Sequence, residues 1–169
     1  MINVKSVMID LQEIISEEIR LNRTLLSALA DEKEAIAAFS LEGINLATAT
    51  KEGIVSSIHS LEERRQSLVS RLAERLQLDP GQLTLARLAR LVKKPFADEL
   101  EKSLRDLREL VHQIDEANRE NAYYIQFTLG FISDSISLIQ STVAPLATYS
   151  AGGKVSHLKL SGRMLRREV

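Results

Sequence analysis

The chain has 169 residues, of which 22 are Lys or Arg and 23 are Asp or Glu, for a formal net charge of -1. It contains no Cys, which excludes a disulfide scaffold and cysteine-bearing metal sites, and its 4% aromatic content leaves little material for a β fold with many turns. No apolar run approaches the ~20 residues that span a bilayer, and the N-terminus lacks a signal-peptide core. We therefore expect a cytoplasmic protein that does not insert into a membrane.

The first predicted element is a long helix over residues 3–39. Its apolar residues recur at steps of three and four, which places them on one face of a helix. Glu18, Asn22 and Glu32 interrupt this face. The apolar positions are Val4, Met8, Leu11, Ile15, Leu25, Leu29, Ile36 and Phe39.

A second helix is predicted over residues 41–78, with Ser40 as its N-cap. Lys51 and Arg65 interrupt its apolar face, and Gly43 lies at a weak point near the turn. Because so short a connection joins antiparallel neighbours, the two helices should form a hairpin. The apolar positions are Ala47, Ile54, Ile58, Leu61, Leu68, Leu72 and Leu76.

The hairpin predicts which residues face each other, because facing residues of an antiparallel pair have numbers with a constant sum. The position of the turn makes that sum 83, which puts Glu32 opposite Lys51 and Glu18 opposite Arg65. Apolar positions then face apolar ones, apart from Asn22. We predict two ion-pair layers that specify the register. In the alternative, these side chains reach the solvent-exposed rim and pair weakly, for under ~1 kcal/mol each.

A short leucine-rich helix follows the hairpin. Residues 79–81, Asp-Pro-Gly, break the second helix, Thr84 is the predicted N-cap, and residues 93–95, Lys-Lys-Pro, end the short helix. Its size and apolar character predict a lid across one end of the helical bundle. Its apolar residues are Leu85, Leu88, Leu91 and Val92.

The longest helical pattern covers residues 97–143, and Pro145 marks its predicted end. A helix of this length extends for about 70 Å. The apolar face begins with Ala97, Leu100, Leu104, Leu107, Val111 and Ile114, and continues with Asn118 and Asn121. Two successive four-residue steps around Ile125 then interrupt the alternation of three- and four-residue steps. Such a stutter locally unwinds a coiled coil and turns the later apolar stripe toward a different neighbour. The later stripe consists of Ile125, Leu129, Ile132, Ile136, Ile139 and Val143.

These elements predict an all-α fold: an elongated antiparallel three-helix bundle or coiled coil over residues 1–148, followed by a basic C-terminal tail over residues 149–169. The last twenty residues carry five basic residues and one acidic residue. Because the third long helix is about ten residues longer than the others, it should extend beyond them by roughly 15 Å. The apolar stripe on this extension is a candidate binding surface; alternatively, a dimer mate or the tail covers it. The extension carries Phe131, Ile132, Ile136, Leu138, Ile139 and Val143.

Catalytic motifs are absent from the sequence. His59, His112 and His157 lack a neighbour at metal-ligand spacing, and no strand precedes Gly152 and Gly153 to make a phosphate loop. We therefore expect no enzyme activity, no cofactor and no metal. The basic tail lacks interleaved aromatic residues and the body is acidic, so we expect no nucleic-acid partner. A histidine phosphotransfer domain acting through His59 stays a third hypothesis, although no Lys-Gly pair follows this residue.

The sequence resembles the FlgN-type flagellar export chaperones over nearly its whole length. In the hairpin, the resemblance rests on Glu18, Leu25, Leu26, Glu32, Ala35, Lys51, Ile54, Leu61 and Arg65. In the second half, it rests on Asn118, Asn121, Tyr149 and Gly152 or Gly153. The family implies a cytoplasmic chaperone that binds the C-terminal helical segments of hook-filament junction (hook-associated) proteins. Such a chaperone keeps its client soluble and monomeric and delivers it to the type III export gate.

Under this resemblance we expect the client helix to pack against the late apolar stripe of the long helix. The predicted client-binding residues are Ile125, Leu129, Ile132, Ile136, Ile139 and Val143. Tyr149 is the predicted contact with the export gate, or else a packing residue at the helix end. The predicted register residues are Glu18, Glu32, Lys51, Arg65, Asn118 and Asn121. We expect a monomer or weak homodimer; the alternative function is a coiled-coil structural or adaptor protein that acts through homo-oligomerisation.

Overall fold

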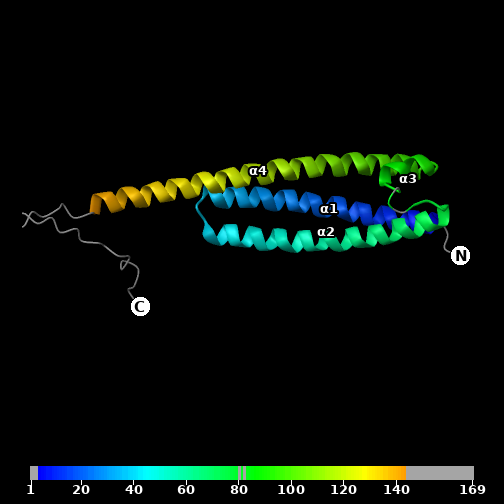
Figure 1. The fold of residues 1–169 in the computed structure, drawn as a ribbon, viewed down its shortest axis with the longest axis horizontal. Helices are drawn as coiled ribbons and strands as arrows, with labels where there is room; N and C mark the ends of the chain where they lie inside the picture. The colour runs from blue at the N-terminus through cyan, green and yellow to red at the C-terminus, as the bar shows by residue number, and fades with distance from the viewer. Residues whose placement is uncertain (1–3, 80, 82, 144–169) are drawn as a thin grey trace, which may run out of the picture. The chain divides into compact units, whose positions relative to one another are not determined.

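The structure, a computed structural model, describes residues 4–79, 81 and 83–143. The described residues form four α-helices and no strand, which confirms the predicted all-α class. Each helix begins and ends within two residues of its predicted bounds. The helices are α1 (Val4–Ala37), α2 (Leu41–Leu76), α3 (Leu85–Leu91) and α4 (Phe96–Val143) (Figure 1).

The chain divides into two units, Met1–Phe127 and Thr128–Val169. The first unit contains α1, α2, α3 and most of α4, and the described part of the second unit is residues 128–143 of α4. The predicted domain boundary after residue 148, the predicted helix end at Pro145 and the predicted gate contact Tyr149 all lie outside the described residues.

A tight turn joins α1 to α2. α1 ends because Phe39 adopts a left-handed backbone conformation with φ 54°, and the Ser40 N–H then donates to the Ala35 carbonyl at 2.9 Å. Ser40 is the N-cap of α2, as predicted, and its Oγ accepts from the Gly43 N–H at 3.1 Å. A Cβ at Gly43 would lie 2.8 Å from the Ala35 Cβ, so glycine lets the two helices approach closely here.

α1 and α2 lie side by side as an antiparallel hairpin (Figure 1). The apolar faces predicted for both helices supply most of the core. The central part of this core consists of Ile14, Leu21, Leu25, Ala28, Leu29, Ile54 and Leu61, with Ile114 and Ala117 of α4 packed against it. α2 ends at Leu76, two residues earlier than predicted, because Gln77 turns left-handed with φ 54°.

The short helix α3 closes one end of the core. Thr84 is its N-cap, as predicted, and its Oγ1 accepts from the Arg87 N–H at 3.2 Å. Leu88 and Ala89 are buried, and they belong to one apolar cluster with residues from the other three helices. The other helices contribute chiefly Met8, Leu11 and Ile15 of α1, Leu72 and Ala73 of α2, and Leu100 and Leu110 of α4.

Within the first unit, α4 runs parallel to α1 and antiparallel to α2. Gln12 of α1 donates to Glu99 of α4, and Lys33 of α1 pairs with Glu120 of α4 at 2.6 Å. Both contacts join residues that are 87 positions apart, so α4 keeps one register with α1 over six turns or so.

Two predicted positions on the α4 seam were wrong. Val111 is 58% exposed and its neighbour Leu110 is buried instead; likewise Asn118 is exposed and Ala117 packs against the core. The seam therefore steps by three and then four residues from Leu100, in the opposite order to our prediction. The physical reason is that apolar residues at both 110 and 111 fit a helical stripe, so only the neighbouring helices decide which one is enclosed.

Candidate functional site

A buried polar layer joins the three long helices near the end of the first unit. Glu32 of α1 is 5% exposed, and its Oε1 lies 2.6 Å from the Lys51 Nζ of α2. Asn121 of α4, 3% exposed, donates from Nδ2 to the other Glu32 oxygen at 2.9 Å and to the Leu29 carbonyl at 2.8 Å. Both carboxylate oxygens of Glu32 therefore have a partner, and each partner comes from a different helix.

The second polar layer of the hairpin is less complete. The Arg65 Nε lies 3.4 Å from the Glu18 Oε1, but the hydrogen bonds of the Arg65 guanidinium go to Glu62, at 3.0 Å from Nε. Within the described residues, the Glu18 Oε1 accepts no hydrogen bond although it is buried. Burial raises the pKa of Glu18, the Arg65 charge opposes this shift, and the nearby Glu62 adds to it.

Both ion pairs are therefore present at the predicted residues, Glu32 with Lys51 and Glu18 with Arg65. The carboxylate side chains are only 7% and 8% exposed and are enclosed between the helices, whereas the Lys51 and Arg65 side chains are each 21% exposed and reach partly to solvent. Removing the cation of such a pair is costly because it leaves a buried carboxylate without its partner, and a shifted register would do this at both layers at once. That these layers specify the register stays a prediction.

The sequence did not reveal a third polar contact between α1 and α4. The Lys33 Nζ lies 2.6 Å from Glu120 and 5.4 Å from the ring centroid of Tyr124. The Glu120 hydrogen bond raises the pKa of Lys33. Glu120 and Tyr124 are four residues apart and so share one face of α4. This spacing predicts that the two are neighbours, but it does not predict that Lys33 of α1 contacts them.

The predicted client-binding residues occupy the late part of α4, where most of their side chains are exposed. Leu129 is 60% exposed and Ile139 62%, and Ile132 and Ile136 are exposed as well. Ile125 is half-buried, and the side chain of Val143 lies outside the described residues. We name Ile125, Leu129, Ile132, Ile136 and Ile139 the isoleucine ridge. Exposure on this scale is unusual for large aliphatic residues spaced along a single helix face.

A second set of exposed apolar residues lies on another face of α4. Phe131 and Leu138 were predicted as part of the apolar extension, whereas Tyr124 and Phe127 were not predicted. We name Tyr124, Phe127, Phe131 and Leu138 the aromatic ridge; their exposure ranges from 39% to 68%. Their spacing of three, four and seven residues places them on one helix face. The isoleucine ridge continues the apolar stripe predicted for this helix. The aromatic ridge shows the same spacing of three and four residues, but on a different face of the helix.

The chain around these ridges is almost free of charge. From Asn121 to Val143 the sequence contains one charged residue, Asp134. The remaining polar positions are Ser, Thr, Gln and Asn, and most of the Ser and Gln side chains lie on the helix face between the two ridges that also carries Gly130. A surface with this composition favours a partner that buries apolar area and needs no ion pairs.

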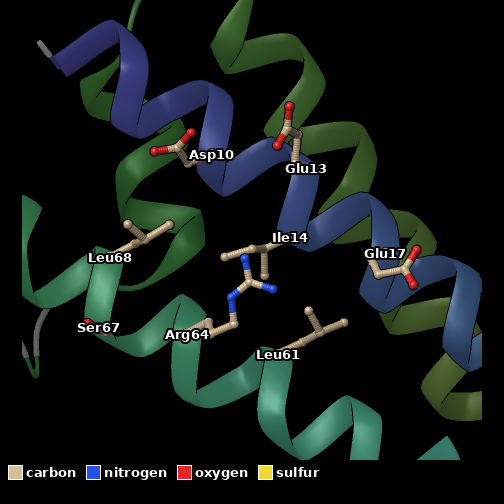
Figure 2. Close-up of a pocket in the computed structure, with 8 residues that line it drawn as sticks. All are labelled: Asp10, Glu13, Ile14, Glu17, Leu61, Arg64, Ser67 and Leu68. Atoms are coloured by element: carbon tan, nitrogen blue, oxygen red, sulfur yellow. The ribbon is translucent and has the colours of Figure 1, made fainter.

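A groove of about 480 Å³ runs between α1 and α2 (Figure 2). Asp10, Glu13 and Glu17 line it from α1, and the Arg64 side chain extends from α2 toward α1. Its apolar lining comes from Ile14, Leu61 and Leu68, of which the first two are already buried in the hairpin core. The groove is therefore an open furrow with charged rims, and it offers little exposed apolar surface to a ligand.

The histidines that the structure describes are surface residues. The His59 Nε2 lies 3.5 Å from Glu63, and the His112 Nδ1 lies 3.3 Å from Glu116, in each case one turn along the same helix. The prediction that these histidines lack an acidic neighbour at metal-ligand spacing was therefore wrong, because residues four apart share a helix face. In the described part of the chain, no group of three or more His, Cys, Asp or Glu side chains is placed to hold a metal ion. His157 lies outside the described residues.

None of the described helices has both the length and the apolar content that a bilayer span requires.

A comparison with protein families places the chain among known proteins. The family model of the FlgN protein matches residues 8–157, which include almost all of α1 and the whole of α2, α3 and α4. No curated protein and no solved structure matches the chain. Because the match extends over most of the chain, it concerns the complete set of helices and not one amphipathic segment.

Proposed function

This chain belongs to the FlgN family of flagellar export chaperones, and we propose that it captures a helical segment of its client on the isoleucine ridge of α4. The observation that carries the proposal is the exposure of Leu129, Ile132, Ile136 and Ile139 on one helix face. An amphipathic client helix would bury its own apolar side chains against this ridge. Val143 continues the same stripe in the sequence and completes the proposed client-binding set.

The proposed clients are hook-filament junction proteins, bound through their C-terminal helical segments in the cytoplasm. We expect such segments to be amphipathic and, when unassembled, to expose apolar surface that would drive premature association. The nearly uncharged surface of the late α4 suits this class of partner because it can cover apolar area without leaving a charge buried. The chaperone would then deliver its client to the type III export gate, with Tyr149 as the proposed gate contact.

We infer that the three long helices, α1, α2 and α4, form an antiparallel three-helix bundle, in which the hairpin of α1 and α2 fixes the first part of α4. The Asn121 hydrogen bonds to Glu32 and Leu29, together with the Lys33–Glu120 pair, support this arrangement in the first unit. No catalytic step is part of the proposed function, since the FlgN family is a family of chaperones. Binding, protection and release are all that the mechanism requires of these residues.

A double substitution tests the proposed client face. Ile132→Asp with Ile139→Asp places two charges on the isoleucine ridge, and we expect it to abolish binding of a C-terminal fragment of a hook-filament junction protein, measured by calorimetry. Both side chains are exposed, so helicity by circular dichroism should not change. Ser133→Asp with Gln140→Asp is the matched control, because it repeats the spacing on the polar face of α4. If the Ile132/Ile139 variant still binds the fragment, the client surface lies elsewhere.

The alternative function, an adaptor that acts through homo-oligomerisation, is favoured by the same exposed apolar area. Mass measured over a range of concentrations separates the two functions. The chaperone proposal expects a monomer or weak dimer that forms a one-to-one complex when client is added. A tight dimer that excludes the client would favour the adaptor.

A further inference from the structure

α4 carries two apolar ridges, and the proposed function uses only one of them. The helix face that carries the aromatic ridge changes abruptly from charged and polar side chains to apolar ones. Followed in steps of three and four residues, the same face carries Glu109, Gln113, Glu116 and Glu120 before it reaches Tyr124 and Phe127. The face is thus charged along most of the first unit and apolar from residue 124 onward. A surface that only had to meet water would not change in this way.

From the aromatic ridge we infer, resting on the proposed function, that the client docks on α4 as two helices, one on each ridge. The first argument is width. At about 100° per residue, the two ridges together cover about 200° of the helix circumference. A helix that packs on one partner presents an apolar stripe about 100° wide. One client helix therefore cannot cover both ridges.

The second argument is area. The aromatic ridge exposes roughly 450 Å² of side chain, and the isoleucine ridge a similar area, whereas each partner in a standard interface buries about 800 Å². Because a standard interface is a little over half apolar, one ridge supplies about the apolar area of one such interface, and the two ridges together supply about twice that area. Two docked helices would cover it.

The third argument is linkage. Two client helices joined by a short connection bind in sequence, and the second binds at the high effective concentration set by the first. Two surfaces that each bind one helix then hold the client more firmly than either surface alone. The chemistry of the partner follows from the surface: two helical segments with apolar faces and no charge at their centres, since Asp134 is the one charged residue from Asn121 to Val143.

The test compares substitutions on the two ridges in the full-length chain. Phe127→Asp with Phe131→Asp changes the aromatic ridge, and Ser133→Asp with Ser137→Asp is the control with the same four-residue spacing on the polar face. The probes are two peptides from the C-terminal region of a hook-filament junction protein, one with a single helical segment and one with two. We expect the Phe127/Phe131 variant to bind the two-helix peptide at least about tenfold more weakly, with unchanged helicity by circular dichroism.

The single-helix peptide should bind more weakly than the two-helix peptide and respond to substitution of only one ridge. If the Phe127/Phe131 variant binds the two-helix peptide like the control, while the Ile132/Ile139 variant does not bind it, the two-helix inference is wrong and the proposed function stands. If neither variant loses binding, the proposed function itself is wrong. If the Phe127/Phe131 variant changes only the concentration dependence of the mass, a second copy covers the aromatic ridge and the inference is overturned.

Discussion

The two parts of α4 differ in what surrounds their apolar residues. In the first unit, Leu100 and Leu110 are 1% and 7% exposed, because α1, α2 and α3 enclose them. In the second unit, Ile132 and Ile139, which are just as apolar, are 42% and 62% exposed. The same periodic pattern therefore stabilises the fold in one part and leaves an exposed apolar surface in the other, the surface that we propose for client binding. Periodicity shows that a helix face needs a partner, but not that the partner belongs to the same chain.

The largest expected difference between the two parts is in stability. Leu100→Ala should lower the free energy of unfolding by about 2–5 kcal/mol, because it leaves a cavity in an enclosed core. Ile139→Ala should change it by less than about 0.5 kcal/mol, because the side chain is already exposed. Urea denaturation followed by circular dichroism measures both. Equal losses for the two variants would mean that the late part of α4 is enclosed as well.

A smaller difference is expected between the two asparagines near the end of the first unit. Asn121→Ala removes the hydrogen bonds to the Glu32 Oε2 and the Leu29 carbonyl and leaves both acceptors buried, so it should cost about 1–3 kcal/mol. Asn118→Ala is the matched control, and since Asn118 is exposed we expect a change within about 0.5 kcal/mol. Thermal unfolding of the two variants is the measurement. Since the predicted seam included both asparagines, an equal loss at Asn118 would show that this residue is enclosed as well.

The smallest expected effect concerns Glu18, and it tests how completely the first unit encloses its polar groups. Burial raises the pKa of Glu18, so its charged form is disfavoured in the folded protein at neutral pH. Glu18→Gln should therefore stabilise the protein at neutral pH, by on the order of 1 kcal/mol, because it removes the desolvation cost while Arg65 keeps its hydrogen bond to Glu62. A raised pKa means that the charged carboxyl lowers the stability of the folded protein, and this cost disappears when Glu18 is protonated. The free energy of unfolding of the wild type should therefore approach that of Glu18→Gln as the pH falls through the folded-state pKa of Glu18.

Glu17 is the control for this pH dependence. Its hydrogen bond from Arg20 lowers the pKa of Glu17, so its contribution is present at neutral pH and is lost on acidification. Glu17→Gln should therefore be slightly destabilising at neutral pH, and its difference from the wild type should shrink at low pH. Denaturation curves at several pH values compare the two variants. If Glu18→Gln behaves like Glu17→Gln, Glu18 is solvated and the layer is open.

Much of the fold was predictable from the sequence because it depends on local signals. Helix bounds follow from caps and breakers, and Ser40 and Thr84 cap their helices as the sequence predicts. The hairpin register was also predictable, because a short turn leaves one alignment in which Glu32 meets Lys51 and Glu18 meets Arg65. The candidate surface was partly predictable, as an apolar stripe longer than the hairpin that could cover it.

The sequence by itself thus determined the helices, the hairpin and the all-α class, since these depend on neighbours within a few residues or across one turn. Only the tertiary structure decided which of two adjacent apolar residues, Leu110 or Val111, is enclosed, and that Asn121 is buried while Asn118 is exposed. It also revealed that Tyr124 and Phe127 are exposed. The reason is that burial depends on what packs against a helix face, and an α-helix has the same local geometry whether that face meets a core, a client or water.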